Sequence, residues 1–156
     1  MASTIGLTKV RVDLPHHPST GGEALWAYPI GSDLYELRNV PVFAYGLNYR
    51  DIVLATSDSP DLLPEIRKVV KRNGHRTLRV FFAPNIPGAK KLELLQSLRF
   101  LSTSFERATE RFFALDLQPR ADLTRVRAVL DEWNARGWSE YETCEPRARG
   151  SFDDTP

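Results

Sequence analysis

The stretch from Glu65 to Phe82, EIRKVVKRNGHRTLRVFF, constrains the fold most, because two apolar segments flank an Asn-Gly pair within it. Asn73-Gly74 is the strongest short-range hairpin signal that a sequence offers, since both central positions of a type I′ turn need positive φ. We therefore predict a β-hairpin here. Its second strand is expected to join an all-β part of the chain to a part in which strands and helices alternate.

The predicted hairpin is strongly basic. It holds one acid, Glu65, and the cations Arg67, Lys68, Lys71, Arg72, Arg76 and Arg79. The whole chain has a net charge of only +1, so any electrostatic function must come from such local segregation. The hairpin could bind an acidic protein or phosphates, or it could be a solvated edge whose cations prevent aggregation. Nucleic acid is the least favoured partner, because the chain has no RNP-like aromatic motif, KH loop or helix-turn-helix.

Length and composition indicate a soluble globular protein. With 156 residues, 42% of them hydrophobic and 26% charged, the chain can form one domain, or two very small ones that share a core. Cys144 is the single cysteine, which suits a reducing compartment. The first residues have no apolar signal-peptide region, and no apolar run approaches the roughly 20 residues of a membrane span. We expect a cytoplasmic protein without membrane contact.

Apolar periodicity predicts an N-terminal β-rich part over residues 5–74. The expected strands before the hairpin are residues 9–14, 24–30, 34–40 and 51–56, with Trp26 as an expected core residue. Their short length and spacing favour a small barrel or a strongly twisted sheet.

The second half changes to a β-α-β-β-α-β order over residues 75–145. Helices are predicted from Ala89 to Phe100 and from Leu123 to a stop at Gly137, and strands over 111–117 and 138–143. Residues 101–109 are interpreted as a strand, although apolar spacing there also allows a longer helix. This order is the ferredoxin-like arrangement, so the fold class is α+β. Residues 146–156 are expected to be a disordered tail within one compact unit.

The sequence predicts neither a metal site nor a cofactor. The histidines and Cys144 lack the spacing of metal-binding motifs, and no phosphate-binding glycine loop or nucleophile motif occurs. A small-molecule or enzymatic site remains an alternative. It would use the aromatic segment Asn39 to Tyr49 for stacking, with Tyr45, Asp51, His75 and Arg79 as the candidate ligand-binding residues. Core packing of the aromatic segment is the competing interpretation.

Acidic residues gather near the C-terminal end of the second part. Asp131, Glu132, Glu140 and Glu142 could form a solvated face, or a surface that neutralises a cationic cleft on a partner.

Several spaced sequence pieces resemble a bacterial family of small uncharacterised domains. Leu25-Trp26 resembles a strand ending in LW, and Asp51 with Val53 resembles a D-x-V strand. An N-x-P-F-F-A-Y-G segment is resembled by Asn39, Pro41, Phe43, Ala44, Tyr45 and Gly46. Gly74 to Val80 resembles a G-x-x-T-x-R-V piece, and later residues resemble A-x-D-x-P and W-x-Y-E pieces. The resemblance covers about residues 9–145. The chain departs from the pattern at Arg50, where the family tends to have Gly.

The resemblance implies a compact bacterial domain and supplies no catalytic residues. That profile is similar to single-domain immunity proteins, which neutralise toxins by occluding them. We therefore expect a non-enzymatic protein-binding domain, with a toxin as the candidate partner. The expected contact residues are Arg67, Lys68, Lys71, Arg72 and Arg76 on the hairpin, and Asp131, Glu132, Glu140 and Glu142 at the acidic end. Nucleic-acid binding through the hairpin is the third hypothesis.

Overall fold

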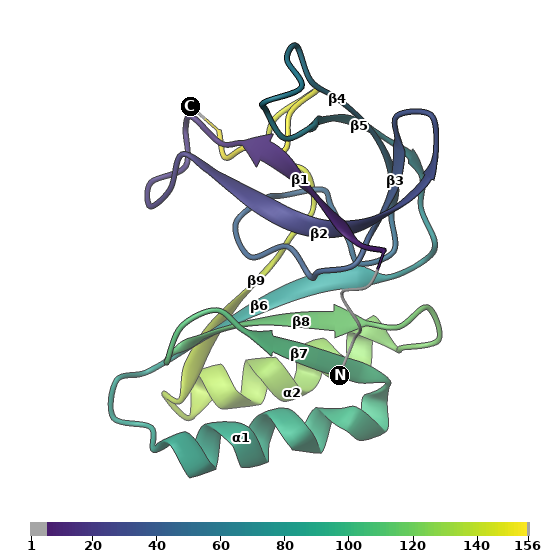
Figure 1. The fold of residues 1–156 in the computed structure, drawn as a ribbon. Helices are drawn as coiled ribbons and strands as arrows, with labels where there is room; N and C mark the ends of the chain where they lie inside the picture. Colours follow the sequence, from purple (N-terminus) through teal and green to yellow (C-terminus); the bar gives the residue numbers. More distant parts are fainter. Residues whose placement is uncertain (1–5, 156) are drawn as a thin grey trace. The chain divides into compact units, whose positions relative to one another are not determined.

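The computed structural model describes residues 6–155 and divides the chain into two compact units. Unit 1 comprises Met1–Asn73 and Glu145–Pro156, and unit 2 comprises Gly74–Cys144. The chain is a mixed α+β protein with mostly antiparallel sheets, which confirms the predicted class (Figure 1). Among the described residues, no helix is both long and apolar enough to cross a membrane.

Unit 1 is a five-stranded sheet with its core on one face. The strands are β1 (Thr8–Asp13), β2 (Gly22–Gly31), β3 (Leu34–Leu37), β4 (Ile52–Thr56) and β5 (Glu65–Lys71). Consecutive strands pair antiparallel, and β1 also pairs with β5 in parallel at Arg11 and Glu65. Leu25 and Ala27 of β2 point into the core, whereas Trp26 between them is only half-buried. The prediction of Trp26 as a core residue was wrong, because successive side chains of a strand point to opposite faces.

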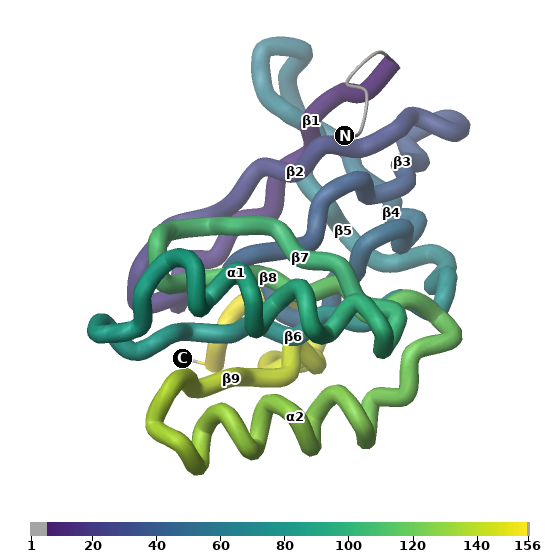
Figure 2. Tube along the Cα trace, turned by 90° about the horizontal axis from the view of Figure 1, so that it is seen from below, coloured from purple at the N-terminus to yellow at the C-terminus, as the bar shows by residue number. Residues whose placement is uncertain are grey.

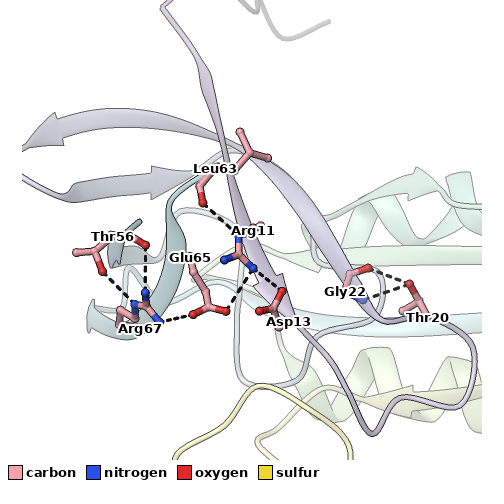
Figure 3. Close-up of polar contacts among 8 residues, drawn as sticks. All are labelled: Arg11, Asp13, Thr20, Gly22, Thr56, Leu63, Glu65 and Arg67. Carbon is pink, nitrogen blue, oxygen red and sulfur yellow. Dashed lines mark hydrogen bonds and ion pairs between the residues drawn. The ribbon is translucent and has the colours of Figure 1, made fainter. Parts of the chain in front are cut away.

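A charged cluster surrounds the single parallel pair between β1 and β5 (Figure 3). The backbone N–H of Arg11 donates to the carbonyl of Pro64 at 2.9 Å. The Arg11 guanidinium lies 2.5 Å from Asp13 Oδ1 and 3.4 Å from Glu65 Oε1, and Arg67 also pairs with Glu65. The two carboxyl groups share a hydrogen bond. This hydrogen bond, burial and the charge of Asp13 together raise the pKa of Glu65. The same hydrogen bond and the Arg11 guanidinium lower the pKa of Asp13.

Unit 2 is a four-stranded antiparallel sheet covered by two helices on one face (Figures 1 and 2). Its elements are β6 (Arg76–Phe82), α1 (Gly88–Ser97), the 3-10 turn η1 (Leu98–Leu101), β7 (Thr103–Arg107), β8 (Phe112–Leu117), α2 (Leu123–Ala135) and β9 (Ser139–Thr143). The strand order is β7-β8-β6-β9, so β9 is an edge strand. The strand interpretation of the ambiguous segment is confirmed over Thr103–Arg107, and η1 ends the preceding helix.

The core of unit 2 lies between the sheet and the helices. Leu78, Val80 and Phe82 of β6 are buried there, and the Phe82 ring stacks on Trp133 of α2 at 6.1 Å between centroids. Asp122 accepts a hydrogen bond from the Arg125 backbone N–H and so caps the first turn of α2.

The predicted hairpin over Glu65 to Phe82 was wrong. Both strands form, but β5 pairs with β4 and β1, whereas β6 pairs with β8 and β9. Only Gly74 has the required positive φ, at 89°, and Asn73 does not. The Asn73 side chain instead donates to the Arg50 carbonyl at 2.6 Å, which holds this segment against unit 1. The boundary between the two units follows directly after Asn73.

The C-terminal segment differs from the expected disordered tail. It belongs to unit 1, where the Tyr45 backbone N–H donates to the Phe152 carbonyl at 2.9 Å. Asp153 is buried and accepts a hydrogen bond from the His16 backbone N–H at 2.6 Å. Backbone groups of two distant loops thus find acceptors in this segment.

The charged cluster of unit 1 gives a pH-dependent stability prediction for Glu65→Gln. Because the folded-state pKa of Glu65 is raised above 4.5, its contribution to stability is present at low pH and is lost as pH rises through the folded-state pKa. Gln cannot ionise and keeps a hydrogen-bond donor for Asp13. The unfolding free energy of the variant, relative to the natural chain, should therefore increase from about pH 4 to about pH 7 in urea titrations.

Glu93→Gln is the matched control, because Glu93 is exposed on α1 and its nearest cation is Lys90 at 4.0 Å. The difference in unfolding free energy between Glu93→Gln and the natural chain should change little from about pH 4 to about pH 7. If the unfolding free energy of Glu65→Gln, relative to the natural chain, falls with rising pH, the pKa of Glu65 is not raised in the folded protein.

Candidate functional site

The sheet face of unit 2 opposite the helices is polar and is built by strand alternation. Leu78, Val80 and Phe82 face the helices, so the intervening residues of β6 face the other side. Cross-strand register aligns three rows on that face: Ser104, Asp116 and Thr77; Glu106, Ala114, Arg79 and Glu142; and Phe112, Phe81 and Glu140.

His75 and Asp116 form a close pair at one end of this face. The Nδ1 atom of His75 lies 2.8 Å and 3.0 Å from the two carboxylate oxygens of Asp116, and Asp116 is buried. A carboxylate at this position orients the imidazole ring and fixes its tautomer. The pair therefore brings one predicted ligand-binding residue beside a carboxylate, as a general base would require.

Arg79 and Glu142 form the second polar pair. Arg79 is only 1% exposed, and its Nε donates to Glu142 Oε1 at 2.9 Å across the β6–β9 ladder. A guanidinium buried to this degree needs a carboxylate partner. Glu142 is therefore a structural partner of Arg79, although the sequence placed it among the partner-binding residues.

Phe81 is the exposed apolar residue of the third row. It is 43% exposed, packs edge-on against Phe112 with 6.0 Å between centroids, and has the Arg111 guanidinium 4.6 Å from its ring centre. Two hollows of about 350 Å³ and 290 Å³ adjoin it, and Phe81 and Glu140 line both. An exposed aromatic side chain between two hollows, next to the edge strand β9, is typical of an interaction site.

The acidic end of the predicted contact set has mixed roles. Asp131 accepts a hydrogen bond from the Tyr141 hydroxyl at 2.6 Å, and Glu132 pairs with Arg136 one helical turn later at 2.9 Å. Glu140 is exposed, and within residues 6–155 its carboxylate has neither a hydrogen bond nor an ion pair. Glu140 is thus the acid that remains available for a partner.

The predicted basic residues are divided between the two units. Arg67, Lys68, Lys71 and Arg72 belong to unit 1, and Arg76 belongs to unit 2. Arg67 pairs with Glu65, and Arg72 pairs with Asp51 at 3.0 Å. The charge that appears continuous in the sequence is therefore not one basic ribbon.

In unit 1, Asp51 forms a buried polar centre. Its Oδ2 accepts hydrogen bonds from the Asn48 backbone N–H at 2.9 Å and from Arg72 at 3.0 Å. Arg72 also donates to the Gly46 carbonyl at 3.0 Å, where φ is 81°. This network explains why the aromatic segment is followed by an aspartate at the start of β4.

The aromatic segment is itself held by backbone contacts. The Glu23 carboxylate accepts from the N–H groups of Val42, Phe43 and Ala44 at 2.8–3.0 Å. Tyr45 is buried, with the Arg147 guanidinium 4.3 Å from its ring centre. These contacts favour the packing interpretation of the segment.

The four residues of the predicted small-molecule site come from both units. Tyr45 and Asp51 lie in unit 1, and His75 and Arg79 lie in unit 2. Within each unit they contact other residues: Asp51 contacts Arg72, His75 contacts Asp116, and Arg79 contacts Glu142. Across the described range 6–155, no group of three or more His, Cys, Asp or Glu side chains could hold a metal ion.

Sequence reasoning missed Phe81 and Arg111 as surface residues. Both lie in segments predicted as strands, residues 65–82 and 111–117, and neither was named as a candidate contact residue. The signal that could have found Phe81 is the run Val80-Phe81-Phe82, because one of three consecutive strand residues must leave the core face.

Comparison with known proteins places this two-unit α+β chain in a family. Residues 23–141 match the family described as a domain of unknown function, DUF4265, so the chain belongs to that family. The structure is similar to a crystal structure of a hypothetical protein from Neisseria gonorrhoeae, with a TM-score of 0.73 at 15% identity, over 88% of this chain and 95% of that one. No curated protein sequence matches the chain significantly.

Arg50 departs from the sequence pattern at a position with left-handed backbone geometry. Its φ is 70°, a conformation that costs a non-glycine residue about 1–2 kcal/mol. Its guanidinium pairs with Glu36 at 2.8 Å, but the Arg50 side chain is 39% exposed, so the pair contributes about 0.2–1 kcal/mol.

We predict that Arg50→Gly raises the unfolding free energy by about 0.5–1 kcal/mol, because the relief of backbone strain exceeds the loss of the ion pair. Urea unfolding would measure this change. Arg50→Ala is the matched control, since it loses the same ion pair without relieving the strain, and it should not stabilise. A glycine variant less stable than the natural chain would show that the Arg50 side chain contributes more to the unfolding free energy than its strained backbone costs.

Proposed function

We propose that the protein is a non-enzymatic protein-binding domain that contacts a basic partner through unit 2. The observation that carries this proposal is the pairing of Phe81, exposed between two hollows, with Glu140, an exposed acid on edge strand β9. An aromatic anchor beside a charged group is a common centre of protein interfaces. We name Phe81, Phe112, Arg111 and Glu140 the Phe81 surface.

The charge around the Phe81 surface favours a basic partner. Glu140 adds a negative charge that has no ion pair in the described part of the chain, and Glu142 is partly exposed two residues later on β9. Arg111 is the one cation of the Phe81 surface, so acids outnumber cations along this edge. A cationic partner would gain complementary charge here, which speeds encounter and improves selectivity.

In its finer form, the proposal is an immunity-type inhibitor that occludes a toxin in the cytoplasm. Many toxins that act on nucleic acids need a cationic cleft, and an acidic surface can occupy such a cleft. We prefer this to nucleic-acid binding by the chain itself. Two of the expected phosphate-binding cations, Arg67 and Arg72, are already paired with carboxylates.

We also propose fold names for the two units. The pairing of β1 with β5 supports a small barrel for unit 1, closed at one parallel pair. The element order and the strand order β7-β8-β6-β9 support a ferredoxin-like unit for unit 2.

The proposal predicts that Glu140→Lys weakens partner binding by about tenfold or more, since it replaces attraction by repulsion at a basic surface. Tagged natural and variant proteins would capture partners from the host lysate, mass spectrometry would identify them, and titration would give the dissociation constants. Glu140 is preferable to Glu142 for this test, because replacing Glu142 would also remove a carboxylate that pairs with the buried Arg79.

Glu93→Lys is the control, since it makes the same charge change on α1, where the Glu93 side chain is 75% exposed. It should retain the affinity of the natural chain, whereas Phe81→Ser should lose affinity like Glu140→Lys. If both Phe81→Ser and Glu140→Lys bind the partner as tightly as the control, the Phe81 surface is not the interface. If the protein is an inhibitor, mixing the natural chain with the captured partner must also suppress the activity of that partner.

A further inference from the structure

Lys91 of α1 is a buried lysine without a carboxylate partner. The residue is 5% exposed and lies on the core-facing side of the helix with Leu94 and Leu95. Its ammonium group donates one hydrogen bond, to the Glu110 backbone carbonyl at 2.6 Å. Within the described chain, no Asp or Glu oxygen comes within 4.0 Å of it, so two of its three N–H donors have no protein acceptor.

This arrangement is unusual for a lysine that serves only packing. Lysines are almost never fully buried unless they are paired, because an uncompensated charge is costly to remove from water. Lys90, the neighbouring residue, shows the ordinary behaviour: it reaches Glu93 at 4.0 Å and lies over the Trp138 ring at 4.9 Å. The contrast indicates that Lys91 is held in place for an acceptor that the chain does not supply.

Lys91 lines a hollow of about 320 Å³ beside α1, β7 and β8. Leu92, Phe105 and Phe113 form its apolar wall. Leu92 is 46% exposed, so its side chain is accessible to a ligand in the hollow. Such a volume matches the lower end of small-molecule sites, which combine an apolar wall with a few polar groups.

The charge in the hollow favours an anion. Arg107 contributes a second cation, and its Nε donates only a long hydrogen bond of 3.3 Å to the Thr109 carbonyl. Glu110 is the one acid that lines the hollow, so the cations outnumber the acids. Gly88 begins α1 there, without a side-chain cap and without an acidic residue in the first turn. The first backbone N–H groups of a helix attract negative charge.

We propose that this hollow binds a small organic carboxylate that carries an apolar group. The carboxylate lies between Lys91 and Arg107 near the start of α1, and the apolar group lies on Leu92 and Phe105. The site is distinct from the Phe81 surface and rests on different residues, so it goes beyond the proposed protein-binding function. Its ligand class is that of a medium-chain fatty acid or an aromatic acid.

The test is a titration of the full chain with sodium octanoate and sodium benzoate, followed by amide chemical shifts in NMR spectra. At least one carboxylate should bind with a dissociation constant of about 1 mM or tighter and shift the amides of residues 88–92 and 105–113. Methyl octanoate and methyl benzoate, which have the same apolar groups without the charge, should bind about tenfold more weakly or worse. Inorganic phosphate should also bind more weakly, because it cannot use the apolar wall.

Lys91→Met removes the buried charge and keeps the length of the side chain, so it should lose carboxylate binding by about tenfold or more. Lys90→Met, the same change one residue earlier, should keep it. Equal binding of acids and esters, phosphate binding as tight as the acids, or unchanged binding by Lys91→Met would each overturn the proposal. If Lys91→Met fails to fold, the acid-ester comparison on the natural chain still decides the outcome.

Discussion

The alternation of side chains along β6 is the constraint on which unit 2 depends. Every second residue of this central strand enters the core beneath the helices, as Leu78 and Phe82 do. The intervening positions must then lie on the other face, and they carry Arg79 and Phe81. The buried ion pair with Glu142 and the exposed aromatic surface are both consequences of that register, because a slip by one residue would exchange the two faces.

Local patterns predicted the elements well and their partners poorly. Period-two patterns placed the strands, and Gly137, with φ of 73°, follows α2 as expected. The Asn73-Gly74 signal failed because a turn propensity says nothing about which strand each flank pairs with. Instead of pairing with each other, β5 pairs with β4 and β6 pairs with β8. Long-range pairing, which no local window contains, decided the topology and divided the basic stretch between two sheets.

The functional residues were predicted less completely, for related reasons. His75 was named as a candidate ligand-binding residue, but its contact with Asp116 could not be predicted, because the β6–β8 register brings the two together. Lys91 gave no signal at all, because a lysine on a predicted helix is ordinarily assigned to the solvated face. The acids at the C-terminal end were recognised as a group. The structure separates the structural partner Glu142 from Glu140, whose carboxylate is left for other contacts.

Amide hydrogen exchange on the captured complex tests the central claim most directly. If the Phe81 surface is the interface, binding of the partner will slow exchange at β9, Ser139–Thr143, and at the end of β6, while α1 exchanges as in the free protein. Protection confined to β5 or to the loops of unit 1, with β9 unchanged, would contradict the claim and place the interface elsewhere.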